Sequence, residues 1–124
     1  MSNFTIKEQS SAKYTAILKD ETDTVIPLVD ITALILSLFL PETTDLDIVN
    51  SRDDQNVLNT NNVTVHATSG LLTWLIQPED TTIVDTDRQM PYEIHRALFE
   101  FTFSGGKKGK HTVDLYIQNL QRIP

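Results

Sequence analysis

The sequence contains no cysteine and no long hydrophobic run. Without cysteine, disulfide bonds, thiolate metal sites and cysteine nucleophiles are all excluded. The longest apolar stretch, residues 31–40, has about half the length that a helix needs to cross a bilayer. The first residues also lack the basic segment and apolar run of a secretory signal. We therefore expect a soluble protein that is not exported and has no membrane partner.

Basic residues are also scarce. The chain has 10 Lys and Arg against 17 Asp and Glu, a net charge of −7, which disfavours a nucleic-acid partner. Acidic residues concentrate between Asp20 and Asp54, whereas Lys107, Lys108 and Lys110 follow a pair of glycines. Ordinary solubility explains this charge pattern first. The alternative is that the opposite charges attract neighbouring copies or an anionic partner surface, with Lys107, Lys108, Lys110, Asp53 and Asp54 as the candidate interface residues.

Alanine and other helix-favouring residues are few, and β-branched residues are abundant. The 124 residues include 16 threonines, 11 isoleucines and 8 valines but only five alanines. Side chains of this kind suit a pleated sheet better than a helix. A chain of this length forms one hydrophobic core, so we expect residues 1–124 to be a single all-β domain.

Short β-favouring segments recur along the chain and are separated by polar turns. In the segment 33–40, apolar residues occupy both alternating faces of the expected strand. This pattern predicts a central strand that is covered on both faces, or one on which a partner chain covers a face. The other strands expected in the first half are at residues 5–8, 14–18, 25–28, 46–49 and 57–58.

Two hairpins and one helical turn are predicted in the second half. Residues 63–67 and 71–76 face each other across Gly70, which can supply the positive φ of a tight turn. Pro78 and the acids after it indicate a short helical turn near residues 78–84, with Ile83 and Val84 returning to the core. In the last hairpin, one face of each strand is apolar, and a polar loop at 104–110 joins the strands. These apolar positions are Ala97, Phe99, Phe101 and Phe103, then Val113, Leu115 and Ile117.

No motif predicts catalysis, a cofactor or a metal. The Gly-Lys loop lacks the Ser or Thr of a phosphate-binding loop and joins two strands instead of a strand and a helix. His66, His95 and His111 have no zinc-ligand spacing and are interpreted as isolated sheet-face or surface residues.

Carboxylates occur in close pairs in the polar segments of the chain. The pairs are Asp45 with Asp47, Asp53 with Asp54, Glu79 with Asp80, and Asp85 with Asp87. They lack the pattern of an EF-hand, so we interpret them as solvated loop residues. Binding of calcium by a loop is the alternative.

The order of several short segments resembles the immunoglobulin-like structural domains of tailed bacteriophages. The resemblance spans Tyr14 to Leu120 and is closest to the amino-terminal domain of baseplate upper proteins of siphophages. The segments that carry it are Leu18-Lys19-Asp20, Val29-Asp30-Ile31-Thr32-Ala33, Gly70-Leu71-Leu72-Thr73-Trp74 with Gln77-Pro78-Glu79-Asp80, and Ala97-Leu98-Phe99-Glu100-Phe101-Thr102-Phe103. The segment 43–62 is longer than that pattern requires, and residues 1–124 include no shaft or receptor-binding segment of the baseplate type.

The resemblance implies an immunoglobulin-like antiparallel β-sandwich of about seven to nine strands. A small β-barrel with the same strands is the alternative fold. The core is expected to contain Trp74, Phe99, Phe101 and Phe103, and the apolar patterns add Leu36 and Leu115.

The function that follows from the resemblance is that of a non-enzymatic virion structural protein, made in the host cytoplasm. Such a protein would decorate the capsid, or act as an adaptor at the neck or tail, in several copies that contact other virion proteins. The alternative is a carbohydrate-binding or host-adhesion module, which would need an exposed aromatic platform.

Overall fold

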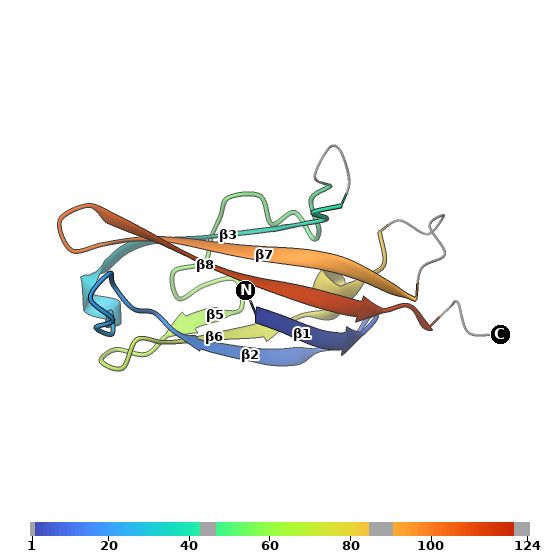
Figure 1. Ribbon diagram of the computed structural model, residues 1–124, viewed down its shortest axis with the longest axis horizontal. Helices are drawn as coiled ribbons and strands as arrows, with labels where there is room; N and C mark the ends of the chain where they lie inside the picture. The colour runs from blue at the N-terminus through green and yellow to red at the C-terminus, as the bar shows by residue number, and fades with distance from the viewer. Residues whose placement is uncertain (1, 43–46, 85–90, 121–124) are drawn as a thin grey trace.

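A computed structural model of the chain describes residues 2–42, 47–84 and 91–120. Within these ranges, eight strands form a five-stranded sheet of order β1-β8-β7-β3-β4 and a three-stranded sheet of order β2-β6-β5 (Figure 1). The strands are β1 (Ser2–Lys7), β2 (Ala12–Ile17), β3 (Ile31–Phe39), β4 (Gln55–Asn56), β5 (Val63–Val65), β6 (Leu71–Ile76), β7 (Tyr92–Phe103) and β8 (Lys107–Gln118). The only helices in these ranges are the 3-10 turns η1 (Leu28–Asp30) and η2 (Pro78–Thr81). Neither turn is long and apolar enough to cross a membrane.

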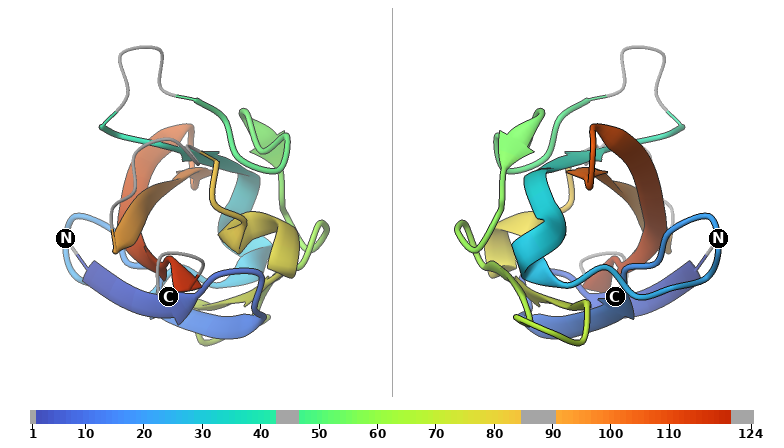
Figure 2. Two further views of the ribbon diagram at one scale, coloured as in Figure 1. Left: turned by 90° about the vertical axis from the view of Figure 1, so that its right-hand side faces the viewer. Right: turned by 90° about the vertical axis from the view of Figure 1, so that its left-hand side faces the viewer.

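The two sheets enclose the core between them, and the five-stranded sheet curves over the other one (Figure 2). Trp74 of β6 packs edge-on against Phe99 of β7, with 5.6 Å between the ring centroids, and thereby joins the layers. This arrangement confirms the prediction of an all-β, immunoglobulin-like sandwich. All six predicted core residues are buried, with exposed fractions of 5% or less: Leu36, Trp74, Phe99, Phe101, Phe103 and Leu115.

The last hairpin forms as the alternating pattern predicts. β7 pairs with β8 in antiparallel register along its full length, and its odd-numbered residues from Glu93 to Phe103 are buried. Gly109 lies opposite Phe101, where a Cβ would come within 2.4 Å of Cε2 of the phenylalanine ring. The loop itself is shorter than predicted, because the turn covers only residues 104–106 and Lys107 already belongs to β8.

The predicted hairpin between β5 and β6 is confirmed. Its Gly70 has φ +70°, and a Cβ there would lie 2.9 Å from the backbone oxygen of Ile26. The helical turn is confirmed as η2. Ile83 packs partly buried against the core, but Val84 is 42% exposed, so the prediction that both residues return to the core is wrong for Val84.

Two predictions about strands need correction. β1 runs parallel to β8, with Phe4 opposite Leu115, whereas the sandwich was expected to be antiparallel. The chain after β1 crosses to the other sheet as β2 and does not form a hairpin with β1. Residues 25–28 form only an isolated bridge from Val25 to Lys19, since Pro27 has no N–H to donate and η1 follows it.

Two further strands also differ from expectation. The strand expected at 57–58 lies two residues earlier, at Gln55–Asn56, as β4. Val57, which follows β4, is fully buried in the core. Of the expected strand at 46–49, residue 46 lies outside the described residues, and Ile48 makes an isolated bridge to Phe39.

Candidate docking surface

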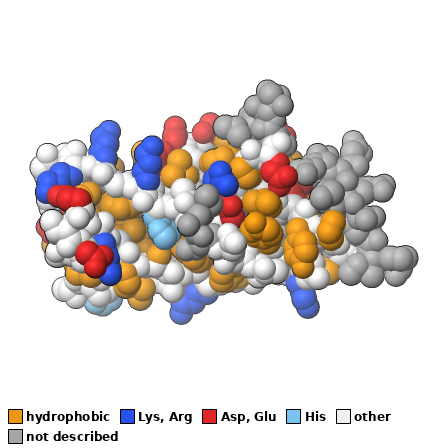
Figure 3. All heavy atoms as spheres, in the orientation of Figure 1, with side chains coloured by type: hydrophobic (Ala, Val, Ile, Leu, Met, Phe, Trp, Pro, Cys, Tyr) orange, Lys and Arg blue, Asp and Glu red, His pale blue; other side chains and the backbone are white. Residues whose placement is uncertain are grey.

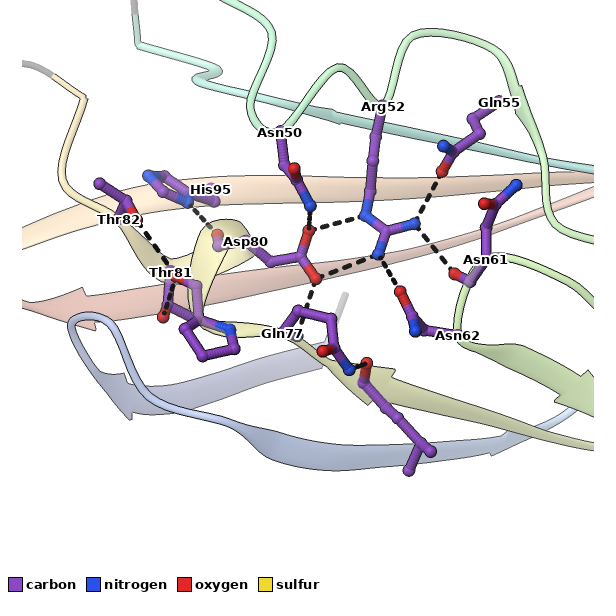
Figure 4. Close-up of polar contacts among 12 residues, drawn as sticks. Asn50, Arg52, Gln55, Asn61, Asn62, Gln77, Asp80, Thr81, Thr82 and His95 are labelled. Atoms are coloured by element: carbon purple, nitrogen blue, oxygen red, sulfur yellow. Dashed lines mark hydrogen bonds and ion pairs between the residues drawn. The ribbon is translucent and has the colours of Figure 1, made fainter.

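A buried ion pair joins the segment before β4 to η2 (Figure 4). Arg52 donates from Nε to Oδ1 of Asp80 at 2.6 Å and from Nη2 to Oδ2 at 3.2 Å. The exposed fractions are 2% for Arg52 and 0% for Asp80. The Asp80 carboxylate also accepts hydrogen bonds from the Asn50 side chain and from the backbone N–H of Gln77. The sequence-based interpretation of Asp80 as a solvated loop acid is therefore wrong.

The remaining donors of Arg52 bind the segment that leads to β5. Nη1 donates to Oε1 of Gln55 at 2.7 Å and to the backbone oxygen of Asn61 at 3.1 Å. Nη2 also donates to Oδ1 of Asn62 at 3.1 Å, and the guanidinium carbon lies 5.8 Å from the centroid of the Trp74 ring. One side chain thus fixes the polar segment 50–62 between the two sheets.

A second buried polar group continues this network. The His95 ring contacts the backbone oxygen of Asp80 through Nδ1 at 2.9 Å and Oε1 of Glu93 through Nε2 at 2.5 Å. Glu93 Oε1 also accepts a hydrogen bond from the backbone N–H of Val84. Because both side chains are buried and bound to protein groups, they connect β7 to η2. The interpretation of His95 as an isolated sheet-face residue is wrong.

The other histidines lie in two separate places. His111 is half-buried on β8, where its Nε2 lies 2.5 Å from the Tyr14 hydroxyl, and burial lowers its pKa below the ordinary value. His66 is exposed, and its Nδ1 accepts hydrogen bonds from the backbone N–H groups of Thr68 and Ser69. In the part of the chain that the structure describes, no three His, Asp or Glu side chains group as metal ligands would. Three carboxylates of the predicted pairs lie outside the described residues: Asp45, Asp85 and Asp87.

The predicted interface lysines are exposed at the start of β8. Lys107 is bound within the chain, because its Nζ lies 2.9 Å from Oε1 of Glu21. This hydrogen bond raises the pKa of Lys107 and lowers the pKa of Glu21. No ion pair among the described residues involves Lys108 or Lys110, so these two charges face solvent.

The predicted acidic residues are exposed on another part of the same sheet. Asp54 precedes β4, and its Oδ1 accepts a hydrogen bond from the Ser37 hydroxyl at 3.1 Å. β7 and β3 lie between this segment and the lysines of β8. The structure therefore does not bring Asp53 and Asp54 together with the lysines, and only the lysines border a hollow.

That hollow has a volume of about 260 Å³ and lies between the β7-β8 hairpin and the segment after β2. Phe101, Phe103 and Gly109 line its apolar part. Lys108 and Lys110 border it on one side, and residues 19–21 border it on the other. Figure 3 shows hydrophobic side chains reaching the surface at this end of the molecule between charged ones. Phe101 and Phe103 are only 5% and 4% exposed, so the hollow presents a narrow apolar strip with a charged border, which suits a short segment of a partner protein.

The buried network was missed from the sequence, although one signal for it exists. Arg52 is the only basic residue between Asp20 and Asp54, a stretch otherwise rich in acids. A lone arginine of this kind needs a specific partner, but its separation of 28 residues from Asp80 gives no spacing rule that identifies the pair.

Comparison with known proteins finds a likeness among solved structures. No protein-family model and no curated protein sequence matches the chain. Among solved structures, the chain is similar to the first Ig-like domain of human CD48 antigen, with 17% identity and a TM-score of 0.40. The match covers 100% of this chain and 85% of that domain. The all-β, two-sheet sandwich is given by the strands of the chain itself, independently of this comparison.

Proposed function

We propose that this protein is a non-enzymatic structural subunit of a tailed-bacteriophage virion. It is made in the host cytoplasm and docks on capsid, neck or tail proteins in several copies per particle. Its surface, and not a reaction centre, is the functional part. The proposal takes its virion context from the sequence resemblance and its docking chemistry from the surface of the sandwich.

The docking role is supported by the contacts of the buried ionisable groups. Arg52, Asp80, Glu93 and His95 are at most 6% exposed, and each is bound to other protein groups. These four groups hold η2, β7 and the segment before β4 together. The docking role is therefore assigned to the surface, and the charged hollow beside β8 is the surface feature that the predicted interface lysines border.

The test is quantitative mass spectrometry of purified phage particles. We expect this chain in intact particles at a fixed number of copies, in a stoichiometric ratio to the major capsid or tail proteins. Absence from intact particles, with the chain abundant in the infected lysate, would contradict the virion role.

One observation keeps a carbohydrate-binding or adhesion module as a second candidate. Trp74 is fully buried and cannot serve as a sugar platform, but Tyr92 is 44% exposed and its ring packs edge-on against Tyr116 at 6.4 Å. Exposed aromatic rings are the surfaces that sugars stack on. A glycan array with the unmodified chain and with a Tyr92→Ala variant tests this candidate, which requires binding that the substitution removes.

A further inference from the structure

β8 has an open edge along the half that follows the β7-β8 turn. β7 pairs with all of β8, whereas β1 pairs with it only from Val113 to Gln118. Within the described ranges, no strand therefore pairs with the outer edge of residues 107–112. Backbone N–H and C=O groups along an open edge are the groups that bind an added strand.

The hollow beside this edge is where alternate side chains of an added strand would reach. Phe101 and Phe103 form its apolar part. Gly109 stands opposite Phe101, and because it has no side chain, the phenylalanine ring keeps the space that a Cβ would need. The hollow therefore offers contact to one apolar side chain of an extended peptide.

The charges around the hollow favour a ligand with carboxylates. The Asp20 carboxylate accepts three hydrogen bonds from Thr22 and Thr24, which lower its pKa, and Glu21 is paired with Lys107. The acids on this side are therefore engaged within the chain. Lys108 and Lys110 face solvent on the other side, in a protein of net charge −7.

We infer that residues 107–112 of β8 bind an acidic peptide segment of a partner protein as an added strand. One apolar side chain of that segment lies against Phe101 and Phe103, and its carboxylates lie beside Lys108 and Lys110. Lysines on an open edge disfavour pairing with uncharged or basic strands, so acidic residues are the partner chemistry that this edge selects. The inference rests on the proposed function, because it names the chemistry of the docking partner.

The experiment is a titration of the isotope-labelled full chain followed by NMR. The probe is the capped peptide Asp-Val-Glu-Val-Asp-Thr, and the control probe is Lys-Val-Arg-Val-Lys-Thr. We expect the acidic peptide to shift the amide signals of residues 107–112 with a Kd of about 0.1–1 mM, and the basic peptide to shift none of them. The Lys108→Glu/Lys110→Glu variant should bind the acidic peptide at least about tenfold more weakly.

The matched control variant is Lys7→Glu/Lys13→Glu. It changes the net charge equally at two exposed lysines on β1 and β2, away from the hollow, and should bind like the unmodified chain. The Lys108→Gln/Lys110→Gln variant removes the two charges without reversing them. If its amide signals are as dispersed as those of the unmodified chain and it still binds the acidic peptide more weakly, the weaker binding is not caused by a loss of folding.

Three outcomes would overturn the inference. They are no shift at about 2 mM peptide, shifts located on another surface, and equal weakening in the control variant. Concentration-dependent shifts of the same amides without peptide would assign the edge to a second copy of the chain, whose exposed Asp53 and Asp54 are the competing acids. The titration needs no particle, so its failure is distinct from absence of the chain from virions.

Discussion

The guanidinium of Arg52 lies 2.6 Å from the carboxylate of Asp80, and both side chains are almost fully buried. Removal of one partner leaves the other charge buried without compensation, which costs about 3–5 kcal/mol. We therefore expect Arg52→Met to lower the free energy of unfolding by this amount in urea denaturation followed by circular dichroism. The Arg52→Met/Asp80→Leu double variant should recover much of the loss.

The control for this prediction is the ion pair between Arg96 of β7 and Asp114 of β8. Arg96 donates to Asp114 at 2.8 Å, but the Arg96 side chain is 33% exposed. Because solvent screens this pair, Arg96→Gln should cost only about 1 kcal/mol. Equal losses of unfolding free energy in Arg52→Met and Arg96→Gln would contradict the prediction that the buried pair stabilises the fold more than the exposed pair does.

The two hairpin turns offer a matched test of glycine. Gly70 and Gly105 both have positive φ, but a Cβ on Gly70 meets the backbone of Ile26 and Leu18, whereas one on Gly105 meets nothing within 4 Å. Gly105→Ala should cost about 1 kcal/mol through φ alone, and Gly70→Ala about 2–4 kcal/mol because backbone must also shift. Thermal unfolding of both variants measures the difference, and similar melting temperatures would speak against the packing at Gly70.

Trp74 is the only tryptophan, and its side chain is fully buried beside Phe99 and the Arg52 guanidinium. Its fluorescence should be blue-shifted and poorly quenched by acrylamide in the folded chain, then red-shifted and readily quenched in urea. Emission already typical of exposed tryptophan in buffer would show that the core is packed differently.

His111 should make stability depend on pH. Burial lowers its pKa in the folded chain below the value of 6.5 that we assume for the unfolded chain. As the pH falls below 6.5, the unfolded state takes up this proton first, so the free energy of unfolding decreases. Above that pH, the histidine is neutral in both states and its contribution is constant.

The measurement is the free energy of unfolding of the unmodified chain and of His111→Gln at about pH 7.5 and about pH 5.5. The unmodified chain should lose more stability on acidification than the variant, because the variant lacks this proton uptake. An equal loss in both chains would mean that burial does not favour neutral His111.

Local patterns in the sequence predicted the parts of the fold that depend on alternation and turn chemistry. The apolar face of β7, from Ala97 to Phe103, and the glycine turn before β6 form as expected. The shape of the β7-β8 turn was only partly predicted, because Lys107 looked like a loop residue but continues the ladder opposite Phe103. Polar composition alone does not distinguish a loop from an exposed strand end.

Features that join distant segments could not be predicted in this way. Asp80 resembles an ordinary acid in the first turn of a helix, and nothing near it in the sequence indicates Arg52, 28 residues earlier. The parallel pairing of Phe4 with Leu115 likewise joins the two ends of the chain. The open edge of β8 follows from how far β1 extends along it, which is a property of the assembled sheet.

The central claim is that this sandwich works by docking on other virion proteins. The most direct test is cryo-electron microscopy of particles produced with and without this chain. The account predicts difference density of the size of this domain at repeated positions, in contact with neighbouring proteins. Identical reconstructions, with the chain recovered only in the unassembled fraction, would contradict it.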